Sequence, residues 1–181
     1  MTRYVALLRA INVGGRTVTM ERLRSLFESL GLGRVESFIA SGNVIFETRA
    51  RDAAVLERRI ERHLAESLGF EVATFLRSPG ELADVVAYEP FASSRPAEPG
   101  HTLWVGFLRA APSEEGRQKL LACRTDTDEF HSHGREAYWL RRTRLSDSTV
   151  TGARLEKALG MPTTWRNITT VRKLALKYAS P

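Results

Sequence analysis

The spacing of apolar residues changes several times along the first half of the chain. An apolar run over residues 4–10, interrupted only by Arg9, predicts a strand covered on both faces. Helical spacing follows over residues 19–31 and again over residues 52–68. Between the two helices VESFIASGNVIFET predicts a β-hairpin, and EVATFLR predicts one more strand. The resulting order βαββαβ is the ferredoxin-like arrangement.

The second half begins in the same way and is expected to close with helices. HTLWVGFLRA predicts a strand, PSEEGRQKLLAC a helix and DTDEFHSHGREAYWLRR a hairpin, followed by helices over residues 150–159 and 164–178. One stripe of the last helix should pack inward, namely Trp165, Ile168, Val171, Leu174, Ala175 and Tyr178. A second stripe faces an anion or water, namely Arg166, Thr170, Lys173 and Lys177.

The two halves share a short sequence. TRYVALLRA at residues 2–10 and TLWVGFLRA at residues 102–110 carry Thr, an aromatic, Val, Leu, Arg and Ala in register. Each copy leads into a predicted helix and hairpin. We interpret this as two related βαββ units in an α+β protein. The predicted organisation is a ferredoxin-like lobe over 1–78, a short helix and linker over 79–100, and a second lobe over 101–181.

Topology places two loops at one edge of the first sheet. The strands joined by the first helix run parallel, so the end of the first strand and the SGN turn lie at the same edge. Strand ends of this kind often bind ligands, and glycine-rich loops expose backbone N–H groups. The candidate site residues for an anionic ligand at this edge are Arg9, Asn12, Gly14, Gly15, Ser41, Gly42 and Asn43. A tight bend and an ordinary hairpin turn would also explain these glycines and asparagines.

The sequence of the loop after the first strand excludes two familiar phosphate-binding motifs. Gly14-Gly15 has no lysine after it, so INVGGR is not a P-loop, and it lacks the glycine spacing of the dinucleotide fingerprint. Arg166 and Asn167 complete the candidate site if the closing segment reaches the same edge. The ligand would then be a nucleotide, a phosphate ester or a nucleic-acid backbone. The cofactor and any reaction stay unknown.

The chain resembles the domain-of-unknown-function family 1697. The resemblance rests on LLRAINVGG, on Met20 at the start of the first helix, on SGNVIF, and on a closing Thr-x-Arg-Asn segment at residues 164–167. In the family pattern an aromatic residue follows the Arg-Asn pair, whereas this chain has Ile168 there and Trp165 ahead of the pair. The resemblance implies an α+β fold of ferredoxin-like character and no established activity.

Charge and cysteine content narrow the class of protein. The 181 residues hold 27 Lys and Arg against 21 Asp and Glu, a formal charge of +6 that favours anionic partners. A single cysteine, Cys123, permits no intrachain disulfide and indicates a reducing compartment. The opening MTRYVALLRA has no signal-peptide pattern, and no apolar run is long enough to span a membrane. We therefore expect a cytoplasmic protein.

Other chemistry has weak support in the sequence. His131 and His133 share one face of a predicted strand, but no spacing typical of a metal site accompanies them. Cys123 ends an apolar helix face and is expected in the core, and Ser41 lacks the nucleophile-elbow pattern. The acidic stretch TDTDE at residues 125–129 is interpreted as a solvated strand entrance.

Three classes of function remain. Anion binding at the strand-end edge is the leading hypothesis, an enzyme acting on a phosphorylated small molecule is the second, and a structural or interaction protein is the third. Base stacking on the sheet, as in RNA-binding ferredoxin-like domains, is disfavoured because the first strand is apolar on both faces.

Overall fold

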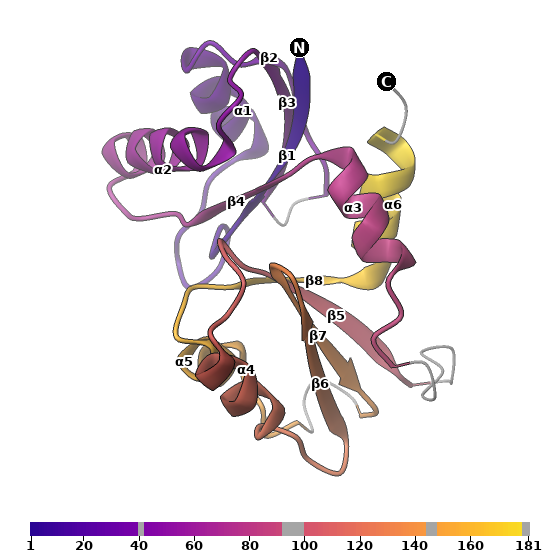
Figure 1. The fold of residues 1–181 in the computed structure, drawn as a ribbon. Coiled ribbons are helices and arrows are strands. Elements are labelled where there is room, and N and C mark those ends of the chain that lie inside the picture. The colour runs from indigo at the N-terminus through magenta and orange to yellow at the C-terminus, as the bar shows by residue number, and fades with distance from the viewer. Residues whose placement is uncertain (40–41, 92–99, 144–147, 179–181) are drawn as a thin grey trace. The chain divides into compact units, whose positions relative to one another are not determined.

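The computed structural model describes residues 1–39, 42–91, 100–143 and 148–178. The chain divides into two compact units, one formed by Met1–Leu82 with the chain end from Tyr178, the other by Ala83–Lys177. Each unit holds one four-stranded sheet, as Figure 1 shows. The units are called the first and second lobe below.

The first lobe has the predicted βαββαβ order, followed by a helix that begins in this lobe and continues past Leu82 into the second. Its elements are β1 (Thr2–Leu8), α1 (Met20–Ser29), β2 (Gly33–Ser37), β3 (Asn43–Thr48), α2 (Ala53–Leu68), β4 (Thr74–Arg77) and α3 (Pro79–Ala87). Thr19 and Asp52 cap the first two helices by accepting hydrogen bonds from the backbone N–H groups of Arg22 and Val55. The α+β class and the ferredoxin-like first lobe are thereby confirmed.

The second lobe repeats the same order of seven elements. These are β5 (Thr102–Phe107), α4 (Glu114–Leu121), β6 (Asp128–His133), β7 (Glu136–Arg141), α5 (Gly152–Leu159), β8 (Thr164–Asn167) and α6 (Ile168–Tyr178). The strand orders β2-β3-β1-β4 and β6-β7-β5-β8 are also the same. The second lobe is therefore itself ferredoxin-like, a step beyond the βαββ unit expected from the sequence.

The prediction of a helix over residues 164–178 is wrong in its first four residues. Thr164–Asn167 is strand β8, and it pairs antiparallel with β5 so that Val105 lies opposite Arg166. The helix begins only at Ile168. Local spacing suggested a helix, but pairing with the central strand decides the conformation of a segment this short. Trp165 and Arg166 consequently belong to no helical stripe. The other members of the predicted inward stripe are buried as expected, namely Ile168, Val171, Leu174, Ala175 and Tyr178.

A pair of hydrogen bonds recurs at equivalent places in the two lobes. The backbone N–H of Thr74, the first residue of β4, donates to Oε1 of Glu61 at 2.9 Å. The backbone N–H of Thr163, just before β8, donates to Oε1 of Glu156 at 2.8 Å. Both threonine hydroxyls donate to a backbone carbonyl two residues earlier, each at 3.3 Å. The similarity of the two halves thus extends from element order to individual contacts.

One pair of facing positions differs in size between the lobes. Ala6 of β1 lies opposite Leu76, whereas at the matching place in the second lobe Gly106 of β5 lies opposite Trp165. A Cβ added at Gly106 would come within 2.8 Å of the Trp165 ring and of Thr163. The smaller residue therefore makes room for the indole.

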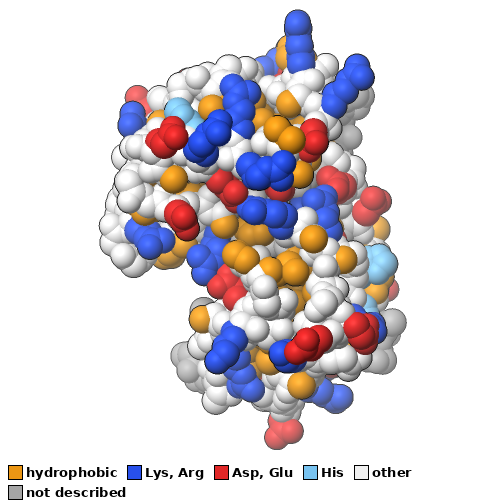
Figure 2. Space-filling view, turned by 60° about the vertical axis from the view of Figure 1, so that its left-hand side comes forward, with side chains coloured by type: hydrophobic (Ala, Val, Ile, Leu, Met, Phe, Trp, Pro, Cys, Tyr) orange, Lys and Arg blue, Asp and Glu red, His pale blue; other side chains and the backbone are white. Residues whose placement is uncertain are grey.

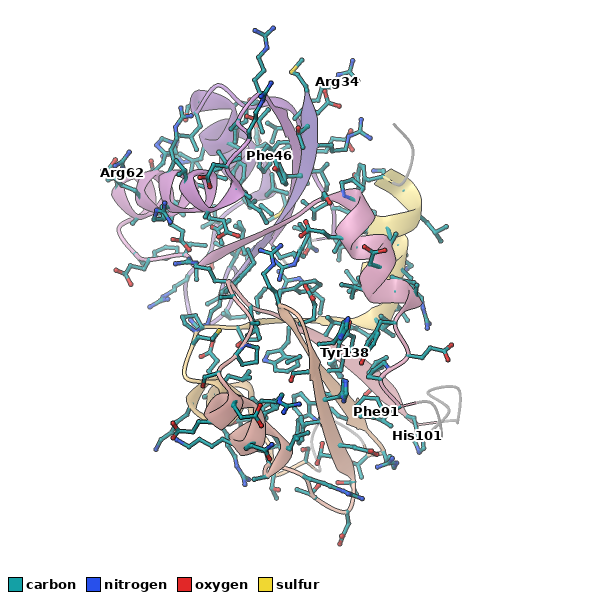
Figure 3. The ribbon with its side chains drawn as sticks, in the orientation of Figure 1. Arg34, Phe46, Arg62, Phe91, His101 and Tyr138 are labelled. Atoms are coloured by element: carbon teal, nitrogen blue, oxygen red, sulfur yellow. The ribbon has the colours of Figure 1, made fainter. Side chains whose placement is uncertain are left out.

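Both faces of the first sheet are covered. Tyr4, Ala6, Leu8 and Phe46 belong to a buried cluster with residues of α1 and α2, and Figure 3 shows Phe46 pointing into the lobe while Arg62 points away from it. Val5 and Leu7, which alternate with those residues along β1, are also fully buried. A stack of bases therefore finds no open sheet face here.

In the part of the chain that the structure describes, no helix has the length and apolar character needed to cross a bilayer.

Candidate functional site

The end of β1 lies between two other segments, as topology predicted. The backbone N–H of Leu8 donates to the carbonyl of Gly42 at 2.8 Å. On the other side, the N–H of Arg9 donates to the carbonyl of Ala73 at 2.9 Å. The loop that follows β1 therefore starts beside the turn that leads into β3. This part of the candidate edge is formed as expected.

The turn beside the strand end needs its glycine and its asparagine. Gly42 has φ +76°, and an added Cβ would lie 3.2 Å from Cβ of Leu8 and 3.3 Å from Cβ of Ile11. Asn43 is fully buried, and its Nδ2 donates to the carbonyl of Phe38 at 3.0 Å. These two residues hold the turn in shape from within. Ser41, the third candidate of this turn, lies outside the described residues.

The loop after β1 holds an unusual run of left-handed residues. Positive φ occurs at Ala10 and Asn12 (59° each), at Gly14 (59°) and at Gly15 (81°). The N–H of Asn12 donates to the carbonyl of Arg16 at 2.9 Å, which closes the loop on itself. Its side-chain Oδ1 accepts the N–H of Val18 at 2.7 Å. Asn12 therefore shapes the loop with its amide side chain.

The crown of this loop displays backbone donors. Val13, Gly14 and Gly15 are exposed. Among the described residues, none accepts a hydrogen bond from the N–H groups of these three residues. Alternating backbone handedness turns successive N–H groups toward one concave side, the arrangement called a nest, which binds anions. The loop therefore exposes three N–H groups for which the described residues provide no acceptor.

The second lobe lacks this loop. Only Ala111 and Pro112 lie between Ala110, which matches Ala10, and the helix cap Ser113. In the first lobe eight residues lie between Ala10 and the cap Thr19. The scaffold folds with either connection. The six extra residues are therefore not needed to join strand and helix.

Two arginines flank the loop. Arg9 is half-buried at the end of β1, as the sequence suggested. Arg16, which sequence reasoning did not select, is exposed, and its guanidinium carbon lies 5.3 Å from the centre of the Phe70 ring. Its position directly after the two glycines is the feature of the sequence that could have identified Arg16 as a candidate site residue. The contact with Phe70 restrains the guanidinium of a residue that directly follows the two glycines.

The remaining candidates, Arg166 and Asn167, belong to the second lobe. Arg166 is only 7% exposed; its Nη1 donates to Oγ1 of Thr164 at 2.8 Å and to the carbonyl of Trp165 at 3.0 Å. Burial lowers its pKa to about 10. Oδ1 of Asn167 accepts the N–H of Thr169 at 2.9 Å, so Asn167 caps α6. Their participation in a ligand site stays a prediction.

The histidines of β6 belong to an aromatic cluster. Tyr88 lies parallel to the ring of His133, with centroids 4.1 Å apart, and its hydroxyl is 2.7 Å from Nε2 of His131. Burial, and to a lesser extent the charges of His133 and Arg117, lower the pKa of His131. Within the described ranges, no group of three or more His, Cys, Asp or Glu residues is placed to hold a metal ion.

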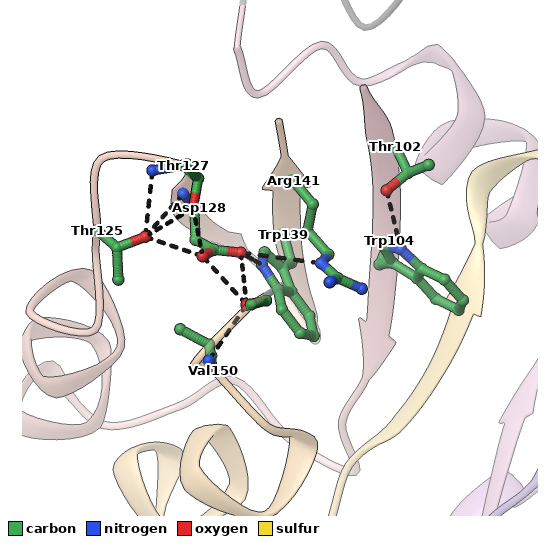
Figure 4. Close-up of polar contacts among 9 residues, drawn as sticks. Thr102, Trp104, Thr125, Thr127, Asp128, Trp139, Arg141 and Val150 are labelled. Carbon is green, nitrogen blue, oxygen red and sulfur yellow. Dashed lines mark hydrogen bonds and ion pairs between the residues drawn. The ribbon is translucent and has the colours of Figure 1, made fainter. Parts of the chain in front are cut away.

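The acidic stretch at the start of β6 is solvated only in part: Asp126 is exposed, whereas Asp128 is buried, which corrects the expectation from sequence at that residue. Asp128 is 1% exposed. Its Oδ1 accepts Trp139 Nε1–H at 2.7 Å, its Oδ2 accepts Thr125 Oγ1–H at 2.8 Å, and Nε of Arg141 lies 3.8 Å from Oδ1 (Figure 4). The partners of Asp128 in this buried ion pair are distant in the sequence. The acidic composition of the stretch alone therefore predicted solvent exposure incorrectly at this residue. Cys123 is buried in the same lobe, as expected.

Fold and loop together define a class: a tandem ferredoxin-like α+β protein in which only one of the two lobes carries a glycine loop at its strand end. The sequence model of a family described as "Protein of unknown function (DUF1697)" matches residues 1–138. The chain belongs to this family, which confirms the resemblance seen in the sequence. No curated protein matches the chain.

A solved structure has the same fold. The conserved bacterial protein SP0830 from Streptococcus pneumoniae superposes with a TM-score of 0.72 at 24% sequence identity. The similarity covers 99% of each chain. This likeness concerns the fold alone.

Proposed function

We propose that the first lobe binds a small phosphate-bearing anion on the loop that follows β1. The observation that carries the proposal is the set of three exposed N–H groups, at Val13, Gly14 and Gly15, in a left-handed loop that the second lobe does without. Phosphate oxygens are strong acceptors, and exposed backbone donors bind them without a motif lysine.

Positive charge near the loop supports an anionic ligand. Arg16 follows the glycines and is held over Phe70, so that less side-chain freedom is lost when it contacts an anion. Charge elsewhere says little about the place of the site. Figure 2 shows Lys and Arg side chains spread over the visible face, with Asp and Glu among them. The proposal therefore rests on loop geometry and Arg16 together with Arg9 at the strand end.

The neighbouring turn has a supporting role in this proposal. Gly42 and Asn43 keep the turn close to the end of β1, and Asn12 holds the loop from inside. None of these three is needed to touch the ligand. Their replacement is expected to disturb binding through the shape of the edge.

A titration with inorganic phosphate tests the proposal. The amide signals of the protein are followed by NMR at constant ionic strength, with chloride replaced stepwise by phosphate. We expect saturable shifts at Val13, Gly14 and Gly15, and weaker binding in Arg16→Gln. Arg22→Gln, an exposed arginine on α1, is the matched control and should leave the affinity unchanged. Shifts that avoid the loop, or that never saturate, would contradict the proposal.

A further inference from the structure

Two exposed apolar side chains accompany the proposed anion site. Most large apolar residues of the described chain are buried, but Val13 is 56% exposed and Ile39 is 48% exposed. Val13 lies on the loop after β1, between Asn12 and Gly14. Ile39 lies on the segment that leads into the neighbouring turn. Neither apolar side chain would make a favourable contact with a bare inorganic anion.

The loop and the turn are packed against each other. The position of a Cβ on Gly42 lies 3.3 Å from Cβ of Ile11, so the glycine of the turn touches the base of the loop. Ile11 is buried at 5% exposure, two residues before Val13. Gly42 follows Ile39 by three residues. Val13 and Ile39 therefore stand on two joined segments at one edge of the sheet.

Ile39 occupies a conformation that its side chain disfavours. Its φ is +55°, in the left-handed region where a β-branched residue is a rare outlier. Asparagine or glycine would occupy this backbone with less strain. The chain uses glycine at Gly42 close by, yet it keeps an exposed isoleucine at position 39. An apolar contact with a ligand would account for that choice.

Resting on the proposed anion site, we infer that its ligand is a mononucleotide. The phosphate monoester would lie on the N–H groups of Val13, Gly14 and Gly15, and the flat base would lie against Val13 and Ile39. A terminal phosphate offers three oxygens to these three donors, whereas a phosphodiester within a strand offers two. Both faces of the first sheet are buried, so a longer nucleic acid gains no stacking surface from the sheet.

Comparison of three ligands tests the inference. Inorganic phosphate, ribose 5-phosphate and AMP are titrated into the full chain, with affinities from NMR shifts and calorimetry. We expect AMP to bind about tenfold more tightly than ribose 5-phosphate, because the base covers apolar surface. Val13→Ser and Ile39→Asn should reduce AMP affinity to the level of ribose 5-phosphate and leave ribose 5-phosphate binding unchanged. Val55→Ser, at an exposed valine of α2, is the control and should change neither.

The outcomes separate this inference from the proposed function. Equal affinities for AMP and ribose 5-phosphate, with the loop amides still shifting, would overturn the inference and leave anion binding intact. A short single-stranded oligonucleotide is titrated as a further ligand, and tighter binding of it than of AMP would also overturn the inference, in favour of nucleic acid. Absence of binding by all three ligands would remove both proposals. The melting temperature of Ile39→Asn is measured as a check on folding, and it is expected to stay close to that of the original protein because asparagine tolerates the left-handed backbone.

Discussion

Arg77 of β4 and Arg166 of β8 occupy equivalent positions in the two lobes. Arg77 lies opposite Val5 and Arg166 lies opposite Val105, and the two valines match in the repeated strand sequence. Each arginine donates from Nη1 to the carbonyl of the residue before it, at 2.9 Å and 3.0 Å. Their side chains are 0% and 7% exposed. A buried arginine at this register is therefore a property of the duplicated scaffold.

Lysine should not replace either arginine without loss. A lysine carries no planar guanidinium and cannot reproduce the bonds of Arg166 to Thr164 and the backbone. We expect Arg77→Lys and Arg166→Lys each to lower the free energy of unfolding by about 1–3 kcal/mol. Urea denaturation measures the change. Arg172→Lys, at an exposed position of α6, should stay within about 0.5 kcal/mol of the original protein, and an equal loss there would refute the structural role.

The two lobes differ in how much of their folding could be read from the sequence. The first lobe was predicted element by element, because its helices are long and its strands keep clear apolar patterns. Strand β8 was missed because its four residues gain their conformation from pairing with β5. The candidate edge was found through topology. Arg16 was missed because its partner, Phe70, follows the second helix and no local pattern joins the two.

Gly42 and Gly15 provide a matched test of steric need. Both have positive φ, but a Cβ at Gly15 would meet nothing within 4 Å, whereas one at Gly42 would press on Leu8 and Ile11. We expect Gly15→Ala to cost about 1 kcal/mol of stability through backbone strain alone. Gly42→Ala should cost at least about 1 kcal/mol more. Chemical denaturation of both variants measures this difference in unfolding free energy. Equal losses in the two variants would mean that the turn relaxes around the added methyl group and that the close approach at Gly42 has no energetic consequence.

Asp128 should be among the most sensitive positions of the second lobe. Asp128→Asn removes the charge that faces buried Arg141 and disturbs the acceptors for Trp139 and Thr125. We expect a loss of about 3 kcal/mol in the free energy of unfolding. Asp126→Asn, two residues earlier and exposed, should change it by less than about 0.5 kcal/mol. Similar effects for the two variants would argue against the buried pair.

His131 gives the second lobe a dependence on pH. Because its pKa is lowered in the folded protein, the unfolded chain binds the proton more readily. The associated stability is present above the unfolded pKa of about 6.5 and is lost as the pH falls through that value toward the folded pKa. We expect unfolding free energies measured between about pH 7.5 and pH 5 to fall less steeply in His131→Gln. An identical slope in both proteins would rule out this contribution.

The replacement of Ala6 and Leu76 by Gly106 and Trp165 has a consequence for folding fidelity. A chain that carries nearly the same central strand twice risks building β1 into the wrong sheet before its partners are sorted. In that mispaired sheet the methyl group of Ala6 would collide with the indole that Gly106 leaves room for. One methyl group would therefore impose a steric penalty on this mispairing, which the native pairing of Gly106 with Trp165 does not carry.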